Sequence, residues 1–388
     1  MILLESGDIL STVVWFLMFF VLVFLYPRLM LSQMIFKLEQ SATKLERMAE
    51  RSVSMTARKV EKNPSKELKK KIEDFSEFFV IEPSNIDPYG LVKKIDQTIR
   101  GMEDRFDEFV DDVAKKRPYN EKQEINYGMR ATIGVKQIAK IVRHYVETAK
   151  KFKNLQIAMI LQMQLPIIEK LAEAELKGAE AFVNGWPVGD SIGPLCAATL
   201  VTHSKELAED VMVGHVKMEG RNCFVMKAKG PAPHLGREDE AIVKLMKKHR
   251  IARIITIDAA QKMEGEKSGA VAEGIGFAMG GWAQREMIEN IIIPKKIPID
   301  SIVVKVGMTE AIVPMPKEIY DAVPKVHELI RKAIRRTRKG ETVIIIGVGN
   351  SSGIGNDKKS TEGVEKLVLG FDKKRKEEEG KQKKGGWF

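Results

Sequence analysis

Apolar residues follow three different patterns along the chain, and each pattern predicts a different kind of structure. Residues 9–35 begin with an uncharged run, "ILSTVVWFLMFFVLVFLY". Its length is close to the roughly 20 apolar residues that cross a lipid bilayer as a helix. We therefore predict one transmembrane helix over residues 9–35, and a juxtamembrane helical stalk over residues 36–62.

The charges on the two sides of this predicted helix differ in sign. Residues 1–8 carry Glu5 and Asp8, whereas Lys and Arg are frequent in the segment that follows the helix. Cytoplasmic flanks of membrane helices carry an excess of Lys and Arg. The pattern predicts a single pass through the cell membrane, with residues 1–8 outside and the rest of the chain cytoplasmic.

Residues 63–180 show the period of amphipathic helices. Apolar residues recur at every third or fourth position, as at Leu91, Ile95, Ile99, Met102 and Phe106. This spacing places them on one face of a helix. We predict a helical domain over residues 63–180, with the apolar stripe "MILQMQL" in its core.

From residue 181 onward, short apolar runs alternate with helical segments. The runs include "AFVNG", "CFVMKA", "ARIITID", "IDSIVVKV" and "ETVIIIGVG". Such alternation is typical of an α/β domain. We predict a three-layer α/β domain with a mainly parallel sheet over residues 181–370, and a charged, disordered tail over residues 371–388.

Charge and cysteine content narrow the class of protein. The net charge is +11, and the basic residues are spread along the chain. This distribution fits solubility or an anionic membrane surface, and it does not predict specific nucleic-acid binding. The two cysteines, Cys196 and Cys223, form no metal-binding spacing, which argues against a disulfide framework or a structural zinc site.

Candidate chemistry lies in glycine-rich segments that follow the predicted strands. In open α/β sheets, ligands bind beyond the carboxyl ends of the strands. Asp190, in "WPVGDSIGP", is either a helix N-cap or a reactive group. Asp258 ends a buried apolar strand, where an ionised carboxylate needs a partner or a shifted pKa. Asp190 and Asp258 are the candidate catalytic residues, provided that the two carboxyl groups face each other across a cleft.

Further residues of these loops are candidates for ligand binding. They are small or polar and lie beside the predicted strand ends: Gly189, Ser191, His234, Gly349, Asn350, Ser351 and Gly353. The loop "GVGNSSGIGN" lacks the lysine of a phosphate-binding loop, so tight packing against the other loops is the alternative. Asp190, Asp258 and Glu264 could together hold a divalent metal ion through their oxygens.

The motifs "GDSIGPL", "IITIDAA" and "GAVAEGIGFAMGG" occur in this order. In this respect the region resembles the germination-protease and hydrogenase-maturation-peptidase type of α/β domain. The resemblance implies that Asp190 and Asp258 match the two acids of that superfamily, which hold a metal or act in catalysis. The whole chain also resembles an uncharacterised archaeal family of membrane-anchored proteins.

Two classes of function follow from these observations. The first is a membrane-anchored scaffold, sensor or binding module, which acts with an unknown protein, peptide or small ligand and forms a homo-oligomer. The second is a membrane-tethered peptidase or metal-assisted hydrolase, in which one carboxyl group is the general acid and the other activates water. An incomplete catalytic set favours the first class, since folds of this kind host many functions.

Overall fold

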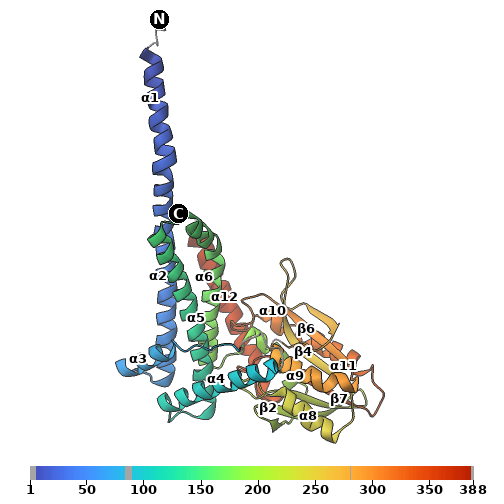
Figure 1. The fold of residues 1–388 in the computed structure, drawn as a ribbon. Helices are drawn as coiled ribbons and strands as arrows, with labels where there is room; N and C mark the ends of the chain where they lie inside the picture. The colour runs from blue at the N-terminus through green and yellow to red at the C-terminus, as the bar shows by residue number, and fades with distance from the viewer. Residues whose placement is uncertain (1–5, 84–89, 280, 386–388) are drawn as a thin grey trace. The chain divides into compact units, whose positions relative to one another are not determined.

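The computed structural model describes residues 6–83, 90–279 and 281–385 (Figure 1). Within them, contacts divide the chain into two compact units. Unit 1 comprises Met1–Arg51 with Gly134–Glu173, and unit 2 comprises Ser52–Ile133 with Ala174–Phe388. The sequence pattern predicts consecutive segments instead, because periodicity does not reveal that one long helix belongs to two units.

Unit 1 begins with a long helical path. It consists of α1 (Ser6–Phe20), a π-helical turn (Val21–Leu25) and α2 (Tyr26–Val60). Of the described residues, Ser11–Val60 is the one helix long and apolar enough to cross a membrane. Its large side chains from Val13 to Tyr26 are exposed. The predicted stalk is therefore a direct continuation of the apolar helix.

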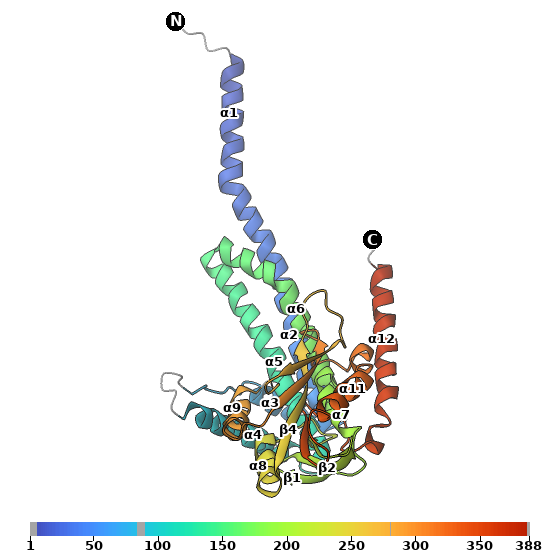
Figure 2. The ribbon, with the colours of Figure 1, turned by 90° about the vertical axis from the view of Figure 1, so that its right-hand side faces the viewer.

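The rest of unit 1 is a helical hairpin that packs on α2 (Figure 2). The hairpin is formed by α5 (Tyr119–Phe152) and α6 (Leu155–Val183), which also continue into unit 2. Apolar side chains of all three helices are buried, among them Leu38, Leu45, Val142 and Leu161. Arg143 adds an ion pair with Glu46, with 2.7 Å between Nε and Oε1.

Unit 2 contains a helical part and an α/β part. The helical part comprises α3 (Lys66–Phe75), α4 (Leu91–Val113) and the adjoining portions of α2, α5 and α6. The side chain of Ser65 caps α3 by accepting a hydrogen bond from the Leu68 amide at 3.0 Å. Buried residues of α2, α3, α4 and α5 form one core, which includes Ile72, Phe106 and Met129.

The α/β part is built on a seven-stranded sheet with the order β1-β2-β3-β7-β4-β6-β5. Strand bounds are β1 Lys205–Ala208, β2 Val211–Met218, β3 Arg221–Ala228, β4 Ile251–Gln261, β5 Val271–Ile275, β6 Ile299–Val306 and β7 Thr342–Gly347. The neighbours β3, β7, β4 and β6 are parallel, whereas β1, β2 and β5 pair antiparallel. The sheet is therefore mixed, and the prediction of a mainly parallel sheet is wrong at its two edges.

Helices cover both faces of the sheet, which makes three layers. One face packs against α7 (Ile192–Ala198) and α11 (Val323–Ile334), and the other packs against α8 (Glu238–Lys248) and α9 (Trp282–Ile292). Shorter elements join these layers: η2 Gly189–Ser191, η3 Ile293–Lys295, α10 Lys317–Tyr320 and η4 Lys359–Thr361.

The segment predicted as a disordered tail is helical as far as Gly385. It belongs to α12 (Val364–Gly385). Phe371 packs against Trp186, with 5.1 Å between the ring centroids, and Val368 is buried in the core. Two properties account for this helix. Its first turns are anchored by apolar contacts, and the Lys and Glu residues that follow have good helix propensity. The charge of the segment alone does not indicate either property.

Candidate functional site

The two predicted carboxylates lie near the carboxyl-terminal ends of the central strands β4 and β7. Strands β4 and β7 are parallel, and Ile257 of β4 pairs with Gly347 at the end of β7, so Asp258 lies beside the start of the loop after β7. The turn that contains Asp190 packs on these ends. A Cβ at Gly193 would collide with the carbonyl oxygen of Val348, so only glycine allows this approach. Two expectations about these acids are wrong. Asp258 does not end its strand, because pairing with β6 extends β4 to Gln261. The run predicted as a strand before Asp190 is the end of helix α6, so Asp190 lies between two helices.

Asp190 is not a helix cap. It lies inside η2, and the residue that precedes α7 is Ser191, whose side chain makes no cap hydrogen bond. Asp190 Oδ2 instead accepts a hydrogen bond from the backbone amide of Asn350, at 2.7 Å. Burial raises the pKa of the Asp190 carboxyl, and this hydrogen bond lowers it in part.

Asp258 is strongly perturbed by its surroundings. Its side chain is buried, and its Oδ1 accepts a hydrogen bond from the amide of Ala259 at 2.8 Å. Burial, with a further contribution from the charge of Asp190, raises the pKa of Asp258 to about 7. A carboxyl group that titrates near neutral pH beside a second acid can exchange a proton, which is the property of a general acid or base.

The predicted ligand-binding glycines serve contacts between loops. A Cβ at Gly189 would collide with the Glu310 carbonyl, and one at Gly353 would collide with the backbone of Pro187. Gly349 has a φ of 121° and lies against the Asp190 carbonyl. These glycines let the loops touch one another, as in the alternative of tight packing given above.

The serines of these loops are also engaged within the protein. Ser191 Oγ donates to the carbonyl of Ser352 at 3.2 Å, and Ser351 Oγ donates to the carbonyl of Ala228 at 2.6 Å. Both serines are fully buried. Asn350 turns its own side chain inward, where Oδ1 accepts from the Ser352 amide at 2.8 Å. Their hydrogen bonds hold the loops in place around the carboxylate pair.

The predicted metal site at these strand ends lacks ligands among the residues that the structure describes. Glu264 is exposed in the loop after β4. Across the described part of the chain, no group of three or more His, Cys, Asp or Glu side chains could hold a metal ion. Asp190 and Asp258 alone supply fewer oxygens than the six to eight that calcium takes.

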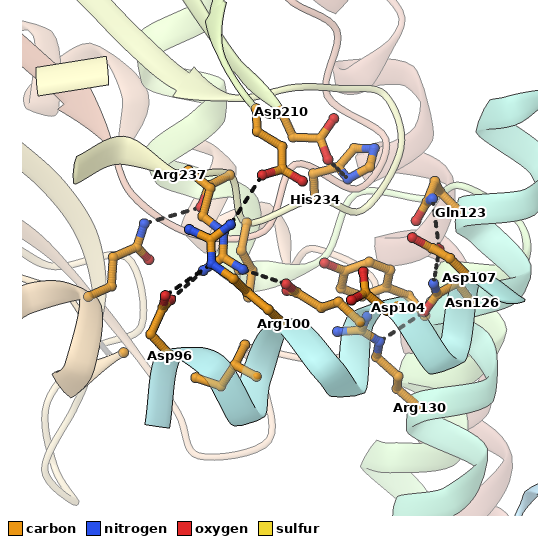
Figure 3. Close-up of a pocket in the computed structure, with 18 of the residues that line it drawn as sticks. Asp96, Arg100, Asp104, Asp107, Gln123, Asn126, Arg130, Asp210, His234 and Arg237 are labelled. Carbon is orange, nitrogen blue, oxygen red and sulfur yellow. Dashed lines mark hydrogen bonds and ion pairs between the residues drawn. The ribbon is translucent and has the colours of Figure 1, made fainter. Parts of the chain in front are cut away.

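His234 accepts a hydrogen bond at its backbone carbonyl from the Ser351 amide, at 3.1 Å, and lines a cavity of about 580 Å³ in unit 2 (Figure 3). Its Nδ1 lies 3.0 Å from Asp210 Oδ2, and Tyr119 donates to Asp210 Oδ1 at 3.3 Å. The Tyr119 ring stacks on the His234 ring, with 5.8 Å between the ring centroids. The carboxylate of Asp210 therefore fixes both rings at the wall of the cavity.

Ion pairs join the helical and α/β parts of unit 2 across this cavity. Arg237 bonds Asp96 at 3.1 Å and Glu103 at 2.6 Å, and its side chain is only 11% exposed. Arg100 bonds Asp96 at 3.0 Å and lies 3.5 Å from Glu209. These contacts come from α4 on one side and from the loops beside β1, β2 and β3 on the other, so the cavity is a junction between the two parts.

Arg130 also lines the cavity and takes no part in these ion pairs. Its guanidinium lies 4.6 Å from the ring centre of Tyr127 and 5.0 Å from that of Phe106. Its Nε donates to Asn126 Oδ1 at 2.8 Å. Arg130 forms no ion pair with any residue that the structure describes. The aromatic rings support a planar, charged group that can still accept an anionic partner.

Sequence reasoning found His234 but missed the rest of this cavity. Its lining comes from α4, α5, the β1–β2 turn, the loop after β3 and the start of α9, which are far apart in the sequence. One signal was present. Asp96, Arg100, Glu103 and Asp107 recur at four, three and four residues, so α4 carries a charged stripe as well as an apolar one.

Fold and site together define a protein in which an apolar N-terminal helix and a helical region precede an α/β domain with a charged cavity and a buried carboxylate pair. Residues 12–185 match the N-terminal domain, and residues 188–355 the C-terminal domain, of the protein family of unknown function DUF1512. The chain belongs to the DUF1512 family. No curated protein and no solved structure matches it, so neither the resemblance to peptidases nor an archaeal origin gains support.

Proposed function

We propose that this chain is a single-pass membrane protein whose cytoplasmic part binds a small polar molecule in the cavity of Figure 3. The observation that carries the proposal is the cavity itself, since its volume of about 580 Å³ lies within the range of pockets for small molecules. Its walls come from two structural parts, so an occupant would contact both. Such a protein acts as a sensor or scaffold.

The unpaired ionic groups of the cavity indicate the chemistry of the ligand. Arg130 has no acidic partner among the described residues, and its planar donors suit a carboxylate or a phosphate. Asp104 is exposed on the same helix as the charged stripe and has no ion-pair partner within the described ranges. We therefore expect a small molecule with an acidic group, held at Arg130, and a donor group that faces Asp104.

The test is to identify small molecules that remain bound to the full chain. The protein is extracted in lipid nanodiscs, and released compounds are compared by mass spectrometry between wild type and Arg130→Gln. Arg105→Gln is the matched control, because Arg105 lies on α4 outside the cavity and pairs with Glu108 at 2.7 Å. A compound lost in Arg130→Gln alone supports the proposal. Identical compounds in all three proteins would refute it.

The membrane anchor has its own support and its own test. The exposed side chains from Val13 to Tyr26 form an uncharged surface all round the helix. The double substitution Leu17→Arg and Phe20→Arg costs roughly 5 kcal/mol of insertion free energy. We expect this variant to leave the membrane fraction in alkaline carbonate, where the wild type stays. Equal retention of both proteins would contradict a membrane span.

A hydrolase that uses Asp190 and Asp258 is the second candidate. The observation in its favour is the pKa of about 7 at Asp258, produced by burial and by the neighbouring Asp190. In this role the protonated Asp258 would donate to the leaving group while Asp190 activates water. Hydrolysis of a peptide library by the purified chain, lost in Asp258→Asn, would support it. No cleavage by the wild type would exclude it.

A further inference from the structure

An apolar surface lies exposed on α6 in unit 1. Met159, Ile160, Met163 and Ile167 are 47, 54, 73 and 61% exposed. Their spacing places them on one face of the helix, which we name the α6 stripe. From Asn154 to Ile168 the sequence "NLQIAMILQMQLPII" contains no charge. Exposed apolar patches of this kind mark interaction surfaces.

The core of unit 1 does not account for the α6 stripe, so the prediction that "MILQMQL" lies in a core is wrong for its outer side chains. The opposite face of the same helix already packs inside the unit through Ala158, Leu161 and Leu165, which are buried. An amphipathic helix needs only one apolar face to join a core. The first turns of α6 are apolar on both faces, so the outer face is available to a partner.

Ionic contacts beside α6 place the stripe outside the hydrocarbon of a bilayer. Lys150 contacts Glu39 near the tip of the hairpin, and Lys44 bonds Glu169 at 2.7 Å at the other end of the stripe. Arg143 of α5 bonds Glu46 of α2 at 2.7 Å in the same unit. Charged groups in this number are not placed in a bilayer core. The partner of the stripe is therefore protein.

We infer that the α6 stripe binds the same stripe of a second copy of this chain. The inference rests on the proposed membrane anchor, because anchored copies share one orientation and can be related by a two-fold axis normal to the membrane. Side chains near such an axis meet their own counterparts. Like charges would repel there, and the stripe has none. Exposed Gln156 and Gln164 carry both a donor and an acceptor, so each can pair with itself.

The membrane anchor also explains why a stripe of four side chains is sufficient to hold two copies together. Confinement to a membrane converts association into a two-dimensional encounter at a raised effective concentration, as a linker does for tethered modules. Four exposed side chains on one helix would be a small interface for proteins that diffuse freely. The same surface can hold together two copies that already lie side by side.

The first test is cross-linking of the full chain in membranes through a cysteine at Met163. Both native cysteines, Cys196 and Cys223, are buried, so an exposed new thiol reacts preferentially. Glu50→Cys, exposed on α2, is the matched control. We expect a short thiol cross-linker to give a covalent dimer with Met163→Cys and at least about tenfold less with Glu50→Cys, because only the former lies on the proposed axis. Equal yields would overturn the inference.

The second test uses charge at the same position. Met163→Glu and Met163→Lys should each weaken self-association by about tenfold or more, since like charges would face each other. Co-expression of the two differently tagged variants should restore co-purification, because opposite charges then meet. Restoration excludes misfolding as the cause of the loss. Wild-type levels of association in both single variants would refute the contact.

Membrane retention keeps this inference separate from the proposed anchor. Variants that remain in the carbonate-resistant membrane fraction but yield no Met163→Cys dimer would contradict the α6 contact and leave the anchor intact. A chain that is released by carbonate yet still dimerises through Met163 would contradict the anchor. Cross-linking of Met163→Cys to a different protein, with no dimer, would assign the stripe to another partner and refute self-association.

Discussion

The backbone amide of Asn350 donates a hydrogen bond to Asp190 Oδ2 at 2.7 Å and so ties a carboxylate to a loop that follows β7. The two residues are 160 positions apart in the sequence but lie at one edge of the sheet. The bond depends on the backbone of Gly349, whose φ of 121° turns the chain toward Asp190. Loop geometry and carboxylate position are therefore one structural feature.

Substitution of Gly349 tests this dependence. In Gly349→Ala, the new Cβ would collide with the Asp190 carbonyl, and the positive φ would be strained. We expect a loss of roughly 2 kcal/mol or more in the free energy of unfolding. Gly370→Ala is the control, since Gly370 lies in α12 with open space where its Cβ would be. Chemical denaturation measures both. Equal stability of the two variants would contradict the close approach.

The raised pKa of Asp258 predicts how stability depends on pH. The folded protein keeps the neutral acid up to about pH 7, whereas the unfolded chain releases the proton near its ordinary value of 3.8. The stabilising contribution of the proton is therefore complete below about pH 4, declines as the pH rises, and is fully lost above the folded-state pKa of about 7. Asp258→Asn keeps a neutral group at every pH. It should be more stable than the wild type by roughly 2–4 kcal/mol at pH 8.

Denaturation curves at pH 4 and pH 8 check this prediction. The advantage of Asp258→Asn should disappear at pH 4, where the wild-type side chain is also neutral. Asp190→Asn provides a second measurement, because removal of the neighbouring charge should lower the pKa of Asp258. An advantage that is independent of pH would show that ionisation of Asp258 is not its cause.

Much of the architecture follows from local patterns. The apolar helix, the helical region and the α/β alternation each have a short period that a sequence displays directly. The direction of the outer strands does not follow from such a local pattern. Strand β2 is antiparallel to β3 through a tight turn, and β5 is antiparallel to β6 through pairing between distant residues. Asp258 could be singled out because an acid in a buried apolar strand is unusual, whereas the strand predicted before Asp190 is the end of α6. The cavity at His234 could not be predicted from the sequence, because its wall joins Glu103 of α4 to Arg237, which is 134 residues away.

Arg237 should hold the cavity together. Its guanidinium is largely buried and bonds both Asp96 and Glu103. Arg237→Met leaves these two carboxylates without their partner, and we expect a loss of about 1–3 kcal/mol, less than for a fully buried pair because both acids are partly exposed. Lys325→Met, which breaks an exposed pair with Glu328, should cause no measurable loss. Equal effects in thermal or chemical unfolding would contradict a structural role for the Arg237 pairs.

The hydroxyl cluster at Thr132 lies in the helical part of unit 2 and joins three hydrogen bonds at one oxygen. Thr132 Oγ1 donates to the Gly128 carbonyl at 2.8 Å and lies 2.6 Å from Ser52 Oγ and 3.1 Å from Thr56 Oγ1. A carbonyl only accepts, so the one proton of Thr132 serves Gly128, and we infer that the hydroxyls of Ser52 and Thr56 donate to Thr132. All three side chains are fully buried. Thr132 is therefore the shared acceptor of two buried donors.

Removal of this acceptor offers a sharp test of the assigned directions. Thr132→Val keeps the shape and should cost about 1–3 kcal/mol, because two donors are left buried without a partner. Replacing all three residues, with Ser52→Ala, Thr56→Val and Thr132→Val, removes those donors as well. The triple variant should therefore recover most of the stability that the single variant loses. A further loss in denaturant melts would contradict the directions assigned to these hydrogen bonds, since a cluster without donors has no unsatisfied proton left to penalise.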